Sequence, residues 1–170
     1  MRHISILALV LFFSISANAA LIIGFNGVIG PLETPELDPL QTANISIATN
    51  EVIDTPGWYV LGVPQGEPGT IYANDPWLHP DLVIGPELPF PGFSSWVIFS
   101  YESLSPIPPG LLVDNITFHC DGPGNVNMLL LGTQDFADWV TLDSQAIRQT
   151  PEPATIALLG LGAMLLKRRR

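Results

Sequence analysis

Residues 20–148 predict an all-β domain, a single β-sandwich of about seven to nine short strands. The segment shows no apolar period of 3.6 residues, which argues against helices. The chain's 17 prolines and 15 glycines are spread through it and divide it into short pieces. Apolar runs rich in β-branched and aromatic residues lie between these turn signals, as in other all-β domains.

In the first half of the domain, residues 20–25 predict the first strand. The dipeptide Asn26-Gly27 predicts a tight hairpin into residues 28–29, since both residues tolerate the positive φ of such turns. Residues 31–40 hold three prolines and three acidic residues and are expected to form a loop. Further strands are expected at residues 44–49, 58–63 and, with a weaker pattern, 70–73.

In the second half, residues 74–95 contain five prolines, so no central strand is expected there. A short edge strand is expected at residues 82–84. Residues 96–101 are aromatic or β-branched on both faces, which indicates a strand in the interior of a sheet. Residues 105–110, with three prolines, predict a rigid turn.

The clearest predicted hairpin joins residues 111–120 to residues 125–131 through the turn sequence Asp-Gly-Pro-Gly. The last strand is expected at residues 139–143, continuing to residue 147. Alternation along the first arm places four apolar side chains on one face. They are Leu112, Ile116, Phe118 and Cys120.

Cys120 is the chain's one cysteine, so the fold holds no intramolecular disulfide. Its place on the apolar face predicts a buried thiol that packs as a small hydrophobe. A disulfide between two chains and a metal ligand are the alternatives that remain open.

The domain is strongly acidic. Between residues 20 and 150 there are fifteen aspartates and glutamates, and Arg148 is the one basic residue. Such a surface repels nucleic acid and anionic lipid, so we expect neither as a partner. It suits a soluble extracellular domain, a divalent-cation binder or a binder of neutral glycans.

Residues 1–19 have the three parts of a signal peptide: Arg2, an apolar run at residues 4–15, and a small-x-small cleavage site. Ala17 and Ala19 form this site, and signal peptidase is expected to cut before Ala20. An uncleaved N-terminal anchor is the alternative, although the run is short for a membrane span.

The C-terminal end, residues 149–170, predicts a sorting tail. Residues 154–166 carry no charge; as a helix they would span roughly 20 Å, short of the ~30 Å hydrocarbon core. The basic residues after this span keep it oriented with the globular domain outside. They are Lys167, Arg168, Arg169 and Arg170. Proline constrains the backbone, so the tripeptide Pro151-Glu152-Pro153 is expected to be an extended, accessible element at the outer membrane surface.

This tripeptide, the short apolar span and the basic end together resemble the PEP-CTERM sorting signal of Gram-negative bacteria. The resemblance implies that exosortase, a membrane-embedded cysteine-type transpeptidase, processes the tail. Pro151, Glu152 and Pro153 would then be substrate residues, with no catalytic role. It further implies an exported protein, transiently anchored in the membrane and then present at the cell surface or outside, often with exopolysaccharide and biofilm. A plain single-span anchor is the alternative.

The two arms of the predicted hairpin, residues 111–120 and 125–131, loosely resemble the late strands of cohesin-like sandwiches in bacterial surface proteins. This likeness has no diagnostic motif and concerns the fold.

No catalytic residue is expected, and the chain is interpreted as a non-enzyme. Ser94 and Ser95 lack the glycines of a nucleophile elbow. His119 lies on the opposite strand face from Cys120, so the two are not expected to share a metal. His79 stands near Asp75 and Asp81, but this spacing matches no zinc pattern.

No cofactor is expected, although calcium is an alternative because it takes carboxylate and carbonyl oxygens from loops. The candidate calcium ligands around the last strand are Asp135, Asp138 and Asp143, and Asp114 and Asp121 flank another strand.

Exposed aromatic residues predict a second kind of site, on which sugar rings could stack. The candidates are Trp58 and Trp77, with Tyr59 and Phe93, whereas Trp96, Phe99 and Trp139 are expected in the core.

These observations favour an exported, non-enzymatic surface or matrix protein linked to exopolysaccharide. A carbohydrate-binding module and a calcium-stabilised adhesion domain on the same scaffold are the alternatives.

Overall fold

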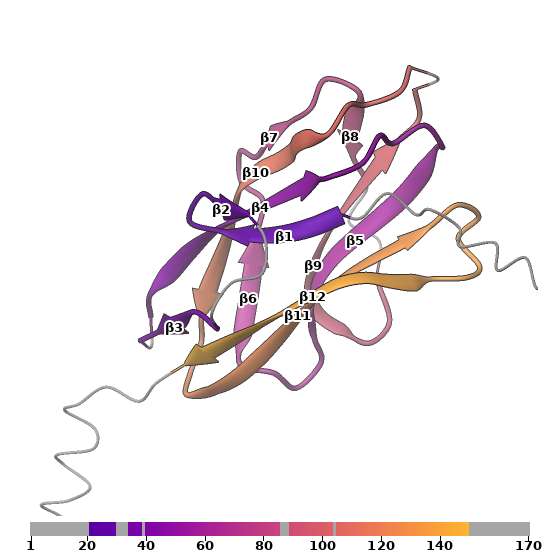
Figure 1. The fold of residues 1–170 in the computed structure, drawn as a ribbon. Helices are drawn as coiled ribbons and strands as arrows, with labels where there is room; N and C mark the ends of the chain where they lie inside the picture. The colour runs from indigo at the N-terminus through magenta and orange to yellow at the C-terminus, as the bar shows by residue number, and fades with distance from the viewer. Residues whose placement is uncertain (1–20, 30–33, 39, 86–88, 104, 150–170) are drawn as a thin grey trace, which may run out of the picture.

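A computed structural model describes residues 21–29, 34–38, 40–85, 89–103 and 105–149. The described chain is all-β, and its strands form two six-stranded sheets that pack face to face (Figure 1). The predicted fold class is therefore confirmed. The expected signal peptide, its cleavage site and the tail after Gln149 lie outside the described residues.

Sheet A has the strand order β2-β1-β4-β10-β6, with β7 pairing β10. Its strands are β1 (Leu21–Phe25), β2 (Val28–Ile29), β4 (Thr42–Thr49), β6 (Gly69–Tyr72), β7 (Trp77–Leu78) and β10 (Gly110–Cys120). Sheet B has the order β3-β12-β11-β5-β9-β8. Its strands are β3 (Glu36–Leu37), β5 (Gly57–Pro64), β8 (Leu82–Ile84), β9 (Phe93–Tyr101), β11 (Gly124–Thr133) and β12 (Val140–Gln149).

The first predicted hairpin is confirmed. Asn26 and Gly27 both have positive φ, 49° and 82°, and Phe25 pairs with Val28 across the turn. This backbone is the type I′ conformation that Asn-Gly favours, because its twist matches that of the strands it joins.

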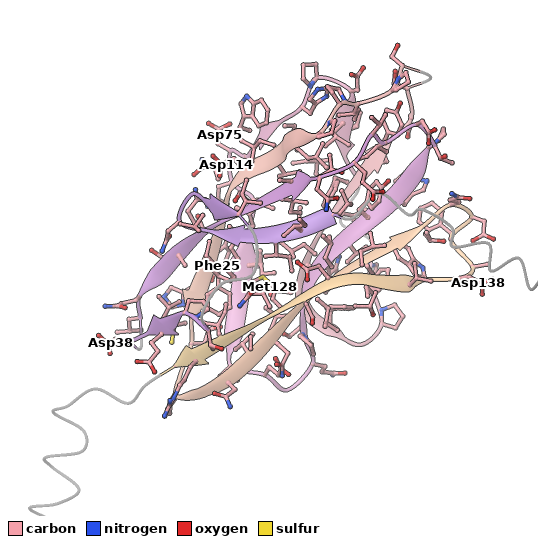
Figure 2. The ribbon with its side chains drawn as sticks, in the orientation of Figure 1. Phe25, Asp38, Asp75, Asp114, Met128 and Asp138 are labelled. Atoms are coloured by element: carbon pink, nitrogen blue, oxygen red, sulfur yellow. The ribbon has the colours of Figure 1, made fainter. Side chains whose placement is uncertain are left out.

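The core lies between the sheets and is built by alternate residues of the long strands. Phe25 of sheet A and Met128 of sheet B are two of its side chains (Figure 2). The predicted apolar face of β10 is confirmed, since its four side chains are almost wholly buried. They are Leu112, Ile116, Phe118 and Cys120.

The second predicted hairpin is wrong. β10 belongs to sheet A, where Cys120 pairs with Gly69, whereas β11 belongs to sheet B, where Gly124 pairs with Gln149. The Asp-Gly-Pro-Gly turn therefore carries the chain across the core from one sheet to the other. Both arms present an apolar face to the same core, so a tight turn with alternating flanks fits this arch as well as a hairpin.

Other differences concern short strands and their ends. There are twelve strands in the described chain instead of seven to nine, because several have only two or three residues. β3 lies inside the predicted loop and pairs parallel with the end of β12. β7 lies in the proline-rich stretch, and β9 begins at Phe93, earlier than predicted. β9 does run between β5 and β8, so the prediction that it is interior is confirmed.

Side chains link the two sheets at both open sides of the sandwich. On one side, the backbone nitrogen of Ile71 in β6 donates to the hydroxyl of Ser95 in β9 at 2.9 Å. On the other, the backbone nitrogen of Ile23 in β1 donates to the carboxylate of Asp143 in β12 at 2.8 Å. Each bond satisfies a strand-edge donor that has no strand partner on that side.

Within the described ranges, no helix is long and apolar enough to cross a membrane.

Candidate functional site

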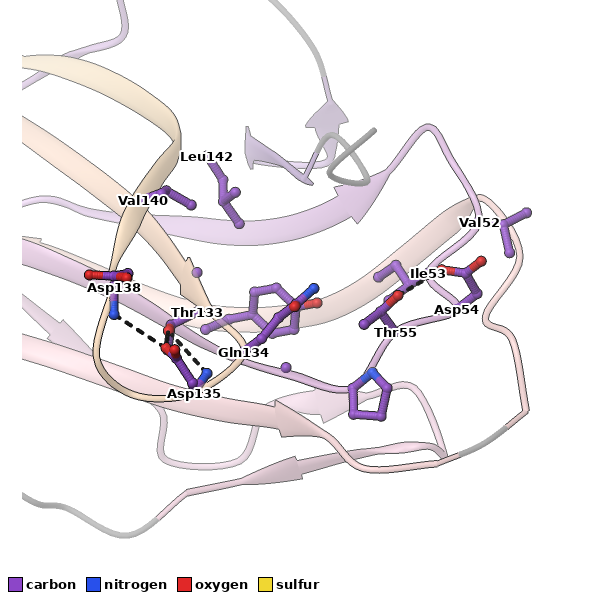
Figure 3. A pocket seen from close by; sticks show the side chains of 14 residues that line it. Val52, Ile53, Asp54, Thr55, Thr133, Gln134, Asp135, Asp138, Val140 and Leu142 are labelled. Atoms are coloured by element: carbon purple, nitrogen blue, oxygen red, sulfur yellow. Dashed lines mark hydrogen bonds between the residues drawn. The ribbon is translucent and has the colours of Figure 1, made fainter. Parts of the chain in front are cut away.

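A cavity of about 340 Å³ opens at one end of the sandwich, between the loop after β4 and the loop joining β11 to β12 (Figure 3). We call it the distal pocket. Its polar lining side chains come from both loops and from β5. They are Asp54, Thr55, Tyr59, Thr133, Gln134, Asp135 and Asp138, with Val52, Ile53, Val140 and Leu142 as apolar neighbours.

Asp135 shapes the loop on the β11–β12 side of the pocket. Its carboxylate accepts hydrogen bonds from the backbone nitrogen of Asp138 at 3.3 Å and from the hydroxyl of Thr133 at 3.1 Å (Figure 3). It also accepts one from the backbone nitrogen of Ala137 at 3.0 Å. These donors, with Ala137 first, hold the pKa of Asp135 below its ordinary value of 3.8. The residue is thus ionised at neutral pH and fixes the turn that follows β11.

Tyr59 forms part of the pocket's wall. Its ring stacks on that of the buried Phe99, with centroids 5.4 Å apart. Burial, and then the neighbouring Tyr101, raises the pKa of Tyr59 above 10.0. The hydroxyl lies against Gly57 at the pocket and takes part in no hydrogen bond with the described part of the chain. It is therefore a neutral donor and acceptor available to a ligand.

The electrostatic character of the pocket is acidic. Asp54, Asp135 and Asp138 line it. Arg148, the one base between residues 20 and 150, stands near the other end of β12 and pairs with Glu36 at 3.4 Å. Such a pocket disfavours acidic ligands and accepts neutral or cationic ones.

The three candidate calcium ligands do not converge in the described structure. Asp135 is engaged by its own loop, and Asp143 accepts from the backbone nitrogens of Ile23 and Ser144. The described ranges contain no group of three histidine, cysteine, aspartate or glutamate side chains placed to hold a metal ion. Calcium binding stays a prediction from the sequence.

The other metal-ligating candidates are also apart. His119 contacts Asp121 through Nδ1 at 2.7 Å, and Asp121 also accepts from Thr70. His79 lies 3.5 Å from Asp81. The side chain of Asn44 donates to Asp114 at 3.1 Å. The carboxylates of Asp81, Asp114 and Asp121 thus contact neighbouring side chains and do not converge on one point. Cys120 is a buried free thiol.

Five aromatic rings form a continuous cluster beside the pocket loop. Trp58 contacts Phe136, which contacts Trp139, and Phe90 joins Trp139 to Phe93. The contacting rings meet at 50° to 88°, so no contacting pair in the cluster is coplanar. Phe136 is 50% exposed and has φ of 62°, an unusual conformation for a bulky residue.

The structure separates the two predicted sugar-stacking residues. Trp58 lies in β5 of sheet B within the aromatic cluster, whereas Trp77 lies in β7 of sheet A and is 49% exposed. Phe99 is in the core as predicted, but Trp96 and Trp139 are half-buried and lie outside it. The reason is that the β9 residues facing the core are Val97, Phe99 and Tyr101, which leaves Trp96 on the other face.

Sequence reasoning missed the pocket, because no motif marks it. Its walls come from two loops more than seventy residues apart. Of its lining residues, Asp135 and Asp138 were predicted only as calcium candidates and Tyr59 only as a sugar-stacking candidate. Long-range pairing of β5 with β11 brings these loops together, and periodicity alone does not reveal such pairing.

The pocket and the tail lie at opposite ends of β12. Val140 lines the pocket at the start of this strand, and Gln149 ends it immediately before the tail. A strand of ten residues spans roughly 30 Å at ~3.3 Å per residue. Figure 2 shows Asp138 at the pocket end and Asp38, next to β3, at the tail end.

Comparison with known proteins gives two findings. The PEP-CTERM protein-sorting motif matches residues 149–170, which confirms the resemblance of the tail and marks the chain as an exported protein. No curated protein matches the chain.

Among solved structures, the fold is similar to cohesin modules. One is from the family 33 glycoside hydrolase of Clostridium perfringens, with a TM-score of 0.47 and 10% identity over 79% of this chain and 99% of that one. Another is the OlpA cohesin of a cohesin–dockerin complex from Clostridium thermocellum, with a TM-score of 0.46 and 7% identity over 77% of this chain and 99% of that one. A third is a ScaB type I cohesin from Pseudobacteroides cellulosolvens, with a TM-score of 0.46 and 10% identity over 77% of this chain and 92% of that one.

Proposed function

We propose that this protein is an exported, non-enzymatic cell-surface or extracellular-matrix protein that its C-terminal tail delivers. The observation that carries this proposal is the sorting motif at residues 149–170, which begins where the last strand of the sandwich ends. In this proposal the described domain is the exported part of the protein, and the tail is its sorting signal.

In this account, signal peptidase removes residues 1–19 and the apolar span at residues 154–166 then holds the chain briefly in the inner membrane. An exosortase-type protease recognises Pro151, Glu152 and Pro153 and releases or transfers the domain. Lys167–Arg170 stay on the cytoplasmic side during this step, since basic residues flanking a span resist translocation.

A binding role suits the domain better than catalysis. Several of its described carboxylates and histidines are engaged in local turns and strand contacts, namely Asp135, Asp143 and His119. The acidic surface keeps the protein soluble among like-charged molecules. Association with exopolysaccharide or biofilm is the role proposed for the delivered protein, and it rests on the tail.

The test is cell fractionation in the native host. Replacing Pro151 and Pro153 by alanine removes the backbone constraint that proline is expected to place on the motif, while the span and basic end stay intact. We expect the variant to remain in the inner membrane and the unaltered protein to reach the surface or medium. Equal distribution of the two proteins would refute the proposal. A Thr150→Ala variant is the matched control and should behave as the unaltered protein.

The distal pocket favours one more specific role, the binding of a neutral glycan. It lies at the end of the domain away from the tail and offers Tyr59, Gln134 and Asp138 as hydrogen-bonding groups. The absence of a coplanar ring pair in the aromatic cluster argues against flat stacking on the sheet, so the pocket is the site proposed for the sugar.

Titration with neutral and uronic-acid polysaccharides tests this role, with tryptophan fluorescence as the signal because Trp58 and Trp139 adjoin the pocket loop. We expect a response to the neutral polymer that Tyr59→Phe weakens. Trp77→Ala, on the other sheet, serves as the control. No response to any neutral polymer would exclude the glycan role and leave the export role standing.

A further inference from the structure

The end of β12 is held unusually firmly for a residue that directly precedes a sorting tail. Gln149 is only 3% exposed. It pairs with Gly124 of β11 on one side and with Leu37 of β3 on the other. Its side-chain nitrogen donates to the carbonyl of Pro68 at 2.6 Å.

Arg148, one residue earlier, adds two contacts. Its backbone nitrogen donates to the carbonyl of Pro35 at 2.9 Å, and its guanidinium lies 3.4 Å from Glu36. We call Arg148 and Gln149, with these contacts to residues 35–37, Pro68 and β11, the tail clamp. It fixes the last two residues of the domain from three directions.

Only Thr150 separates the clamp from Pro151. Peptides that are recognised in extended form present their backbone donors and acceptors and alternate side chains to the protein that binds them. A protease that binds the tripeptide together with the residues before it would make such contacts to Arg148 and Gln149. Arg148 and Gln149 cannot provide them while their backbones are paired with β11 and β3.

The clamp also contains a weak point. The side-chain oxygen of Gln149 is buried and has no hydrogen-bond partner, so half of its amide is satisfied and half is not. An unpaired buried acceptor favours any state in which water reaches it. β3 contributes only two residue pairs, whereas β12 pairs with β11 along nearly its whole length. The clamp can therefore open while the rest of β12 stays in the sheet.

We propose that opening of the tail clamp controls how readily the sorting protease acts at Pro151–Pro153. This inference rests on the proposed function. While the clamp is closed, the sheet withholds Arg148 and Gln149 from the protease, and both must leave the sheet before the tail is cleaved. Processing is then a two-step event: local detachment of the strand end, followed by recognition.

A spacer series in the full-length protein, expressed in its host, tests the proposal. Inserting Gly-Ser-Gly-Ser between Gln149 and Thr150 moves the tripeptide away from the clamp without altering either. Pulse-chase labelling should show several-fold faster conversion to the processed form. The same four residues inserted after Gln134, in the pocket loop, are the control and should leave the rate unchanged. An unchanged rate with the spacer before Thr150 would overturn the proposal.

Engineered disulfides give the opposite test, because they keep the tail clamp closed. Asn125 and Arg148 face each other across β11 and β12, as do Leu129 and Ser144 further along the same strands. Locking the first pair with cysteines should block processing until a reductant is added, whereas locking the second should not, because it leaves the clamp free to open. Equal processing of the two locked proteins would overturn the proposal.

The Pro151→Ala, Pro153→Ala variant separates this inference from the proposed function. If that variant is processed normally, the sorting role itself is refuted. If it is not processed but the spacer and the lock have no effect, only the clamp is refuted.

Discussion

The carboxylate of Asp143 accepts a hydrogen bond from the backbone nitrogen of Ile23 at 2.8 Å and so joins β12 of sheet B to β1 of sheet A. β1 pairs with β4 along its whole length, but the short β2 on its other edge pairs only with Gly24 and Phe25. Ile23 therefore has no strand partner on that edge. The side chain of Asp143 thus supplies the hydrogen-bond acceptor that a neighbouring strand would otherwise provide. This role also explains why Asp143 does not join Asp135 and Asp138 in a calcium site.

Replacing Asp143 by alanine should lower the free energy of unfolding by about 1–2 kcal/mol, because the Ile23 donor loses its partner in a half-buried place. Asp143→Asn keeps an oxygen acceptor and should cost less. Urea denaturation followed by far-UV circular dichroism measures both values. Asp138→Ala removes an exposed carboxylate instead and should stay within ~0.5 kcal/mol of the unaltered protein. Equal losses for Asp143→Ala and Asp138→Ala would contradict the role of the link.

Asp135 should give the pocket loop an acid-sensitive conformation. Backbone hydrogen bonds lower its folded pKa below the ordinary 3.8, so its contribution is complete above that pH and is lost as the pH falls through the folded pKa. We expect the amide NMR signals of Ala137 and Asp138 to shift in this acidic range. Asp135→Asn should abolish the shift, whereas Asp54→Asn should preserve it. Persistence of the transition in Asp135→Asn would assign it to another group.

Cys120 should be unreactive while the protein is folded. The side chain is buried in the core, and burial raises the pKa of its thiol above 9.0, which leaves little of the nucleophilic thiolate at neutral pH. Iodoacetamide should label the denatured protein and leave the native protein unlabelled for hours. Rapid labelling of the native protein, or a dimer that reductant dissociates, would contradict the buried position.

Gly62 should tolerate no side chain. A β-carbon there would lie 2.0 Å from the ring of Phe93, which holds Phe90 against Trp139 in the aromatic cluster. Gly62→Ala is therefore expected to cost roughly 1–3 kcal/mol and to shift the tryptophan emission. Gly122→Ala, where the nearest atom would be 3.9 Å away, is the control. A fully stable Gly62→Ala with unchanged emission would show that Phe93 does not cover this strand.

Local patterns predicted the parts of the fold that depend on neighbours in sequence. The Asn26-Gly27 hairpin and the burial of Cys120 follow from turn preference and alternation, and both are found. The arch after Cys120 was mistaken for a hairpin, because nothing local distinguishes two strands in one sheet from two strands in opposing sheets. β3 was missed because Glu36 and Leu37 gain their strand conformation only by pairing with the distant Arg148 and Gln149.

The candidate sites also differ in whether their residues are contiguous in sequence. The tail could be recognised from sequence because its motif, span and basic end are contiguous. The distal pocket could not, since Asp54 and Tyr59 meet Asp138 only when β5 pairs with β11. Trp58 and Trp77 were each predicted from sequence as sugar-stacking candidates, and only the pairing of the strands shows that they belong to different sheets.

Removal of the C-terminal tail after export would make it a sorting signal for the acidic sandwich and no lasting part of the mature protein. The decisive experiment is intact-mass spectrometry of the protein recovered from the cell surface or medium of its host. We expect a mass that lacks residues 1–19 and the basic end at residues 167–170. A mature protein whose mass still includes Arg170 would contradict it.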